Sequence, residues 1–157
     1  MHKIFPFLWF DHQAEEAVLF YTSLFKHSKI GSVSRYGDAG PGPKGSVMVM
    51  EFELEGQKFS ALNGGPVFTF IPAISFFVNC ESQEELDHYW EALSEGGEKG
   101  QCGWLTDQYG LSWQIVPTVL GELMGDPDPE KAGRVTQAML KMTKLEITEL
   151  QRAYRGG

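Results

Sequence analysis

Two polar residues near position 114 are the side chains of this sequence best suited to contact a ligand. Ser112 and Gln114 alternate with Trp113 and Ile115, which is the period of a strand with two unlike faces. An amide such as that of Gln114 can orient a carbonyl or hydroxyl group of a ligand. We therefore expect Ser112 and Gln114 to face a pocket, while Trp113 and Ile115 face a helix layer.

These residues form the second arm of a predicted hairpin. Asp107–Gly110 has Asp early and Gly late, as tight turns do. If Thr106 pairs with Leu111, the two tryptophans of the hairpin face each other and Gly103 lies opposite Gln114, leaving room beside the amide. A buried amide without partners costs about 1–3 kcal/mol. We predict that Gln114→Leu leaves folding intact and weakens ligand binding at least tenfold, about 1.4 kcal/mol.

Aromatic residues of the predicted first strand, Ile4–Phe10, would line the same pocket. Phe5, Phe7 and Trp9 share one face of this strand, and we assign Phe7 to the core. Apolar walls with a few orienting polar groups are typical of small-molecule sites. The predicted ligand-binding set is Phe5, Trp9, Asn63, Ser112 and Gln114.

Composition excludes several classes of protein. The formal charge of −8 argues against a nucleic-acid partner, which would need clustered Lys and Arg. The longest apolar runs are too short to span a bilayer, and the N-terminus does not resemble a secretory signal. We therefore predict a cytoplasmic protein with no membrane partner. Cys80 and Cys102 form no CxxC pair and are expected to be reduced strand residues.

The hydrophobic pattern predicts two similar units. In the first, a strand over 4–10 precedes a helix capped by Asp11, and three strands follow around the Gly/Pro loop Gly37–Gly45. Glu55-Gly56 is a hairpin signal between the last two of these strands. In the second unit, a strand over 73–80 leads to a helix opened by a Ser82-to-Glu85 capping box and stopped by Gly96-Gly97, before the hairpin described above.

Laid over each other with a shift of 69 residues, the two units agree, which favours duplication. Glu15 then falls on Glu84, Tyr21 on Trp90, and Phe7 on Phe76. After the second unit, Pro127 and Pro129 introduce one helix and a second runs from Glu146 to about Tyr154; both must pack on the sheet or on a second subunit. The prediction is an α+β fold: a first βαβββ module over 1–68, a second module over 69–118, and a C-terminal helical tail over 119–157.

This order of strands, helices and turns resembles that of the PhnB-like family of the vicinal oxygen chelate superfamily, to which glyoxalase I, extradiol dioxygenases and bleomycin-resistance proteins belong. Many members of the family carry the label 3-demethylubiquinone-9 3-methyltransferase. The resemblance rests on these motifs: Leu8-Trp-Phe-Asp11, Ala14-Glu-Glu-Ala17, Phe20-Tyr21, Ala61-Leu-Asn-Gly-Gly-Pro66, Cys102-Gly-Trp104, Asp107, Gly110-Leu-Ser-Trp-Gln-Ile115, and the tail segments Ala138–Met142 and Arg152–Tyr154. The resemblance also implies that the two modules form a curved mixed-sheet cup and that the protein is a homodimer.

The resemblance also locates the metal ligands of the metal-dependent members. Those positions fall here on Phe5, about Ala61, about Ile74, and Gln114. Three are apolar, and a neutral amide is a poor ligand for transition metals, so we predict no metal site. The four histidines lie on or near predicted helices or at the terminus and do not replace these ligands.

We therefore expect a metal-free protein that binds a small aromatic or amphipathic molecule in the aromatic-lined cup, with no cofactor. The alternative is an enzyme, either the methyltransferase of the family label or a metal-dependent lyase or dioxygenase. The common methyltransferase fold needs a Gly-rich loop between a strand and a helix. Gly37–Gly45 is interrupted by two prolines and is interpreted instead as a flexible rim or lid.

Overall fold

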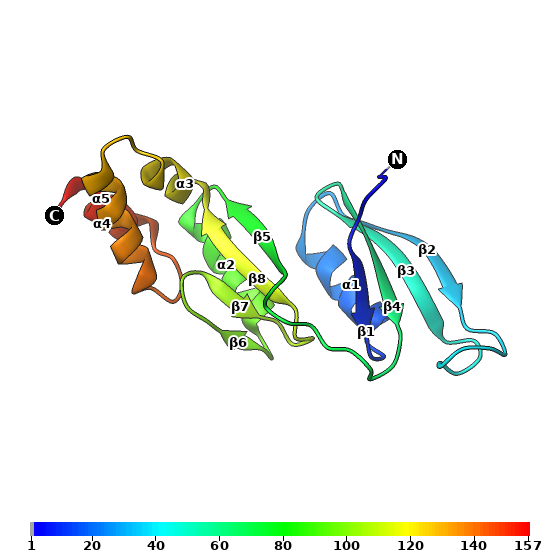
Figure 1. Ribbon diagram of the computed structural model, residues 1–157. Coiled ribbons are helices and arrows are strands. Elements are labelled where there is room, and N and C mark those ends of the chain that lie inside the picture. The colour runs from blue at the N-terminus through cyan, green and yellow to red at the C-terminus, as the bar shows by residue number, and fades with distance from the viewer. Residues whose placement is uncertain (1) are drawn as a thin grey trace. The chain divides into compact units, whose positions relative to one another are not determined.

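The computed structural model describes residues 2–157, which divide into two compact units between Phe70 and Ile71. Unit 1 comprises the residues up to Phe70 and contains β1 (Phe7–Phe10), α1 (Ala14–Leu24), β2 (Lys29–Arg35), β3 (Val47–Leu54) and β4 (Gln57–Asn63). Unit 2 contains β5 (Ser75–Cys80), α2 (Gln83–Ser94), β6 (Glu98–Lys99), β7 (Trp104–Thr106), β8 (Ser112–Pro117), α3 (Thr118–Met124), α4 (Pro129–Leu140) and α5 (Ile147–Arg155). Figure 1 shows the elements in chain order.

Unit 1 is one four-stranded mixed sheet covered by one helix. The strand order is β1-β4-β3-β2, with β1 parallel to β4 and the other pairs antiparallel. Helix α1 buries Ala17, Val18 and Tyr21 and packs against β3 and β4. From β3, Met50 and Phe52 are buried while Glu51 is half-buried, so the strand period separates a helix-facing side from an open side.

Unit 2 repeats this arrangement. Its strand order is β5-β8-β7-β6, again with the first strand parallel to the last. Helix α2 buries Leu86, Trp90 and Leu93 and packs against β5, β7 and β8. The predicted α+β fold of two βαβββ units with mixed sheets is therefore confirmed, and the two-residue β6 is the strand that sequence patterning missed.

The repeat is not in constant register. Ala17 and Leu86 are both fully buried, so a shift of 69 holds for the helices. In the first strands, however, Phe7 is 55% exposed, whereas Phe76 packs against Trp113 with ring centroids 5.3 Å apart. Phe77, 53% exposed, is the true counterpart of Phe7. The predicted pairing of Phe7 with Phe76 is wrong because three residues separate β1 from α1 and only two separate β5 from α2.

The hairpin register is also shifted by one residue from the prediction. Thr106 pairs with Ser112 rather than Leu111, and Trp104, not Gly103, pairs with Gln114. The turn is longer than predicted because the Asp107 carboxylate accepts the backbone N–H of Leu111 at 3.0 Å and keeps that residue in the loop. Room beside Gln114 therefore does not come from a glycine.

Of the two predicted N-terminal helix caps, the one of α2 is confirmed and the one of α1 is wrong. Ser82 caps α2, accepting a hydrogen bond from the Glu85 N–H at 3.1 Å, as predicted. Asp11 does not cap α1; instead Asn63 Oδ1, from the end of β4, accepts the Ala14 N–H at 2.8 Å. The cap is a tertiary contact across the sheet edge, which a local motif cannot show.

The C-terminal helices of unit 2, α3, α4 and α5, pack chiefly on one another, and α3 also contacts β8. Pro129 starts α4, as the prolines predicted, and Gly156, with φ of 85°, ends α5 close to the predicted Tyr154. Helix α3 was not predicted. A backbone hydrogen bond joins the segment between α4 and α5 to the residue before β7: the Gly103 N–H donates to the Thr143 carbonyl at 2.8 Å. A Cβ on Gly103 would lie 2.9 Å from the Ile115 carbonyl oxygen, so this crossing requires glycine.

Two α2 side chains hold this same segment. The Gln83 amide donates to the Leu145 carbonyl at 3.0 Å and accepts the Ile147 N–H at 2.8 Å. Lys144 Nζ lies 2.9 Å from Asp87 Oδ1. Burial opposes ionisation of Asp87, but hydrogen bonds from Gln83 and Lys144, and the charge of that lysine, outweigh it and hold the pKa of the carboxyl below its usual value.

Candidate functional site

The open face of the unit 2 sheet carries a row of three aromatic and amide side chains. Phe77, Gln114 and Trp104 occupy paired positions on β5, β8 and β7. Phe77 is 53% exposed, and Gln114 and Trp104 are half-buried. Trp113 and Ile115 are buried on the helix side, as predicted, so Gln114 lies on the opposite face. The row presents two aromatic groups with an amide between them.

The Gln114 amide is oriented by a neighbouring strand. Its Nε2 donates to Ser75 Oγ at 3.0 Å. Within residues 2–157, Gln114 Oε1 accepts no hydrogen bond, and no buried side-chain oxygen or nitrogen there lacks a partner, so Oε1 reaches solvent. The site therefore offers one accessible acceptor whose direction the Ser75 contact fixes. Ser112 pairs with Ser75 and is 3% exposed.

Asp107 holds this hairpin in shape. Its side chain is buried and accepts the N–H groups of Tyr109 and Leu111 at 2.9 and 3.0 Å and the indole N–H of Trp113 at 2.9 Å. The prediction that Asp107 serves its turn is confirmed. The bond to Trp113 adds a role that sequence spacing did not indicate, since it ties the turn to the helix-facing side of β8.

In unit 1, Trp9 is held rigidly on the open face. Its indole N–H donates to the Gly65 carbonyl at 2.9 Å, and the Phe68 ring meets it edge-on at 4.9 Å. A Cβ on Gly64 would lie 2.4 Å from the indole ring, so the close approach requires glycine there. Phe5 precedes β1, and Lys58 Nζ lies 4.2 Å from the centroid of its ring.

Asn63 lies on the other face of the same sheet. It pairs with Phe10, on the α1 side, whereas Trp9 pairs with Leu62 on the open side. Its amide accepts from Ala14 and donates to the Val47 carbonyl at 3.1 Å, which makes it a helix cap and a brace for β3. The structure thus groups Ser112 with Gln114 in unit 2, and it does not bring Asn63 to the face of Trp9.

The positions expected for metal ligands also do not share one face of a sheet. Ala61 is fully buried and pairs with Leu8 and Met50 on the helix side, so it could not present a ligand on the open face. Ile74 is 69% exposed and precedes β5. Across residues 2–157, no group of three His, Cys, Asp or Glu side chains is arranged to hold a metal ion.

The Gly/Pro loop Gly37–Gly45 closes over one aromatic ring. Tyr36 is buried, and its hydroxyl donates to the Asn63 carbonyl. A Cβ on Gly42 would lie 2.3 Å from the ring, so the loop packs directly on it. The loop joins antiparallel strands β2 and β3, with no helix following it.

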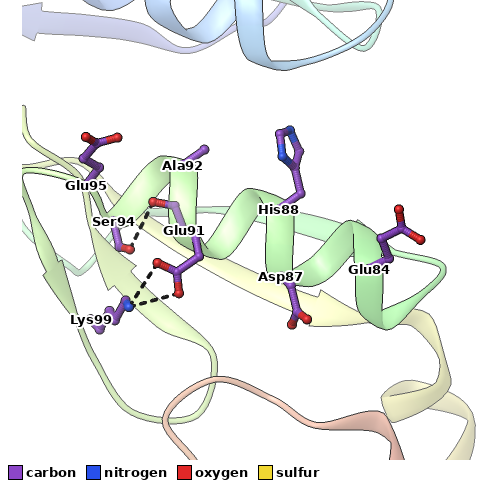
Figure 2. A pocket seen from close by; sticks show the side chains of 8 residues that line it. All are labelled: Glu84, Asp87, His88, Glu91, Ala92, Ser94, Glu95 and Lys99. Atoms are coloured by element: carbon purple, nitrogen blue, oxygen red, sulfur yellow. Dashed lines mark hydrogen bonds and ion pairs between the residues drawn. The ribbon is translucent and has the colours of Figure 1, made fainter.

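A hollow of about 680 Å³ lies along the outer side of α2. Figure 2 shows that it is lined mainly by charged side chains of this helix, with Lys99 Nζ paired to the Glu91 carboxylate at 3.1 Å. Glu84, Glu91 and Glu95 are exposed. This is the polar face of an amphipathic helix, and its lining contains none of the large aliphatic, Phe, Tyr or Trp side chains that are typical of small-molecule sites.

The two cysteines are reduced. Cys80 is fully buried, and burial, together with the charge of Glu85, raises its pKa to about 12, so its thiol stays protonated at neutral pH. Cys102 is half-buried in the loop before β7.

No helix of residues 2–157 has the length and apolar character needed to cross a bilayer.

Duplicated βαβββ units with mixed sheets define the class of the chain as an α+β protein built from a repeated module, as predicted. Within that class, the family model described as 3-demethylubiquinone-9 3-methyltransferase matches residues 2–116, and the chain belongs to this family. The predicted PhnB-like family is therefore confirmed. The match ends before α3, so the tail segments included in the predicted resemblance lie outside it.

Solved structures agree with this assignment. The PhnB protein from Bacillus cereus is 42% identical, with a TM-score of 0.69, and the similarity covers 74% of this chain and 100% of that chain. Protein PA1353 from Pseudomonas aeruginosa, 21% identical with a TM-score of 0.61, covers 74% of this chain and 98% of its own and shares the fold. No curated protein matches the sequence.

Proposed function

We propose that this protein is a metal-free binding protein for a small aromatic or amphipathic molecule, which the open face of unit 2 contacts through Gln114. The observation that carries the proposal is the in-register row of Phe77, Gln114 and Trp104, with Gln114 Oε1 accessible and its amide already fixed by Ser75. The aromatic groups offer apolar contact, and the acceptor selects a ligand that carries a hydroxyl or N–H donor.

The ligand positions of the metal-dependent relatives support a metal-free mode. Phe5 and Ile74 carry no donor atom, Ala61 faces α1, and Gln114 is a neutral amide. A homodimer is part of the proposal, because β2, a sheet edge in unit 1, is exposed along its whole length.

The family description names a methyltransferase, which is the competing function. In the doubly wound type of such enzymes, the cofactor binds a Gly-rich loop between a strand and a helix. Here the Gly-rich loop is the connection of an antiparallel pair, packed on Tyr36. The geometry therefore supports ligand binding better than methyl transfer. Calorimetry with S-adenosylmethionine distinguishes the two functions.

A matched pair of probes tests the role of Gln114. Phenol can donate a hydrogen bond to Oε1, whereas anisole has a similar ring with no donor. Because such a bond contributes up to about 1.5 kcal/mol, we expect the wild-type protein to bind phenol roughly tenfold more tightly than anisole. Binding is measured by titrating ¹⁵N-labelled protein and following the backbone amides of β5, β7 and β8.

The Gln114→Leu variant should keep the wild-type fold, weaken phenol binding at least tenfold, about 1.4 kcal/mol, and abolish the preference over anisole. Gln101→Leu is the matched control, since Gln101 is exposed in the loop before β7 and its side chain makes no bond within residues 2–157. Equal affinities for phenol and anisole in the wild type, or an unchanged preference in Gln114→Leu, would refute the assignment.

A further inference from the structure

The open face of unit 1 contains a second hollow, which the proposed function does not use. It measures about 410 Å³ and lies over β2, β3 and β4. Lys29, Glu53 and Lys58 occupy paired positions across its floor, so their side chains project from the same face. Gly31 adds to the space, because a Cβ there would lie 3.3 Å from Glu51 Cβ and a side chain would occupy part of the hollow.

Charges of both signs line this groove. Lys29 Nζ lies 3.1 Å from Glu53 Oε2, and Lys58 Nζ lies 3.6 Å from Glu51 Oε1. The second separation is longer than a hydrogen bond. The Glu51 side chain is 41% exposed and that of Lys58 is 26% exposed. Ion pairs at such partly exposed positions contribute little, about 0–1 kcal/mol, so a ligand can open this pair at low cost.

An aromatic wall adjoins the pair. Lys58 Nζ lies 4.2 Å from the centroid of the Phe5 ring. Phe7, 55% exposed, shares a cross-strand row with Ser60 and Glu51. Ser60, between them, is 3% exposed and lies beneath this row, whereas Phe7 and Glu51 are accessible beside the hollow and in its lining, so an apolar group on Phe7 and a charged group at Glu51 can belong to one ligand that passes over Ser60.

The balance of charge selects the kind of ligand. With His2 neutral, the two lysines and two glutamates that line the hollow balance and give no net attraction for an anion or for a cation; His2 Nε2 lies 3.9 Å from Glu53 Oε1. A purely apolar ligand would remove these charges from water without replacing their contacts. A zwitterion replaces both, because its ammonium group meets a carboxylate while its own carboxylate meets an ammonium group.

We propose that this groove binds a zwitterionic amino compound with an apolar side chain, such as an aromatic α-amino acid. Its ammonium group pairs with Glu51, its carboxylate pairs with Lys58, and its side chain lies along Phe5 and Phe7. This site lies wholly in unit 1 and shares no residue with the row around Gln114, so it goes beyond the function proposed above.

Three probes that differ only in their charges test the proposal. L-phenylalanine is a zwitterion, phenethylamine lacks its carboxylate, and 3-phenylpropionate lacks its ammonium group. Each is titrated into the ¹⁵N-labelled full chain at neutral pH. We expect L-phenylalanine to bind at least fivefold more tightly than either analogue and to shift the amides of Lys29–Gly31 and Glu51–Lys58.

Substitutions separate the two charges. Glu51→Gln should lower the affinity for L-phenylalanine to that for 3-phenylpropionate, and Lys58→Met should lower it to that for phenethylamine. Glu15→Gln and Lys26→Met, both exposed in unit 1 and away from the groove, are the controls and should change nothing.

Equal affinities for the three probes, or shifts elsewhere in the chain, would overturn the proposal. So would unchanged L-phenylalanine binding in folded Glu51→Gln and Lys58→Met. Loss of L-phenylalanine binding in Gln114→Leu would assign the amino acid to the unit 2 face instead. If L-phenylalanine binds as expected while phenol shows no preference over anisole, the groove stands and the function proposed for Gln114 fails.

Discussion

Replacing Asp107 by Asn should destabilise the hairpin that presents Gln114, although the two side chains have nearly the same shape. The Asp107 carboxylate accepts three N–H groups, two from the turn backbone and one from the Trp113 indole. Asn keeps one oxygen for the turn but turns an NH₂ group toward the indole N–H, so two donors face each other. Because the site is 2% exposed, water cannot replace the lost acceptor.

The expected cost is about 1–3 kcal/mol, the penalty for leaving a buried donor without an acceptor. For a chain of this size, that corresponds to a lowering of Tm by roughly 3–9 °C. Differential scanning calorimetry measures the shift, and the Trp113 indole resonance reports the lost bond directly.

The matched control is Asp38→Asn. The Asp38 side chain is 90% exposed and pairs only with Lys44 among residues 2–157, so its loss should change stability by less than about 0.5 kcal/mol. A Tm of Asp107→Asn within about 1 °C of wild type, with the Trp113 indole signal unmoved, would show that the carboxylate does not hold the hairpin.

Three further predictions concern the tail, the pH response and assembly. Gln83→Ala removes the hydrogen bonds to Leu145 and Ile147, so we expect the free energy of unfolding, measured with denaturant, to fall by about 1–3 kcal/mol. Replacing the exposed Gln137 of α4 by Ala is the control and should have little effect. The pKa of Asp87 is lower in the folded chain, so its stabilising contribution is present above its ordinary value of 3.8 and disappears as pH falls through and below that value. The loss of Tm between about pH 6 and about pH 3 should therefore be smaller in Asp87→Asn, and an identical loss would contradict the shift. Light scattering at micromolar concentration should give twice the chain mass of 17.6 kDa, and a monomer mass would exclude the proposed dimer.

Much of the fold could be predicted because it follows from local patterns. Alternation placed Trp113 and Ile115 on the helix side, and helical periodicity identified the buried faces of α1 and α2. Glu55-Gly56 does form the hairpin turn, with Leu54 paired to Gln57. Each of these features depends on residues only a few positions apart.

The errors arose in two ways: a side-chain bond inside a turn changed a strand register, and a residue distant in sequence supplied a helix cap. The hairpin register shifted because the Asp107 carboxylate retains Leu111 in the turn. The α1 cap comes from Asn63, 49 residues away from Ala14 in sequence. Asn63 lies on the helix side of its sheet, away from the face of Trp9, because it is two residues beyond the buried Ala61 and strand alternation gives both the same face.

The candidate sites were accessible to sequence reasoning in part. The exposure of Gln114 on the open face follows from the strand period, but its row with Phe77 and Trp104 depends on sheet pairing that no local signal specifies. The groove of unit 1 was missed because Lys29, Glu53 and Lys58 come from three strands and look like ordinary surface charges in the sequence.

The most direct test of the proposed function is a crystal structure of the chain soaked with 4-bromophenol, in which anomalous scattering from bromine locates the ligand. We predict that the phenol hydroxyl lies within hydrogen-bond distance, about 2.7–3.0 Å, of Gln114 Oε1, with the ring between Trp104 and Phe77. Bromine found only at other places, or a ring on this face with its hydroxyl turned away from Gln114, would contradict the assignment of that residue as the orienting group.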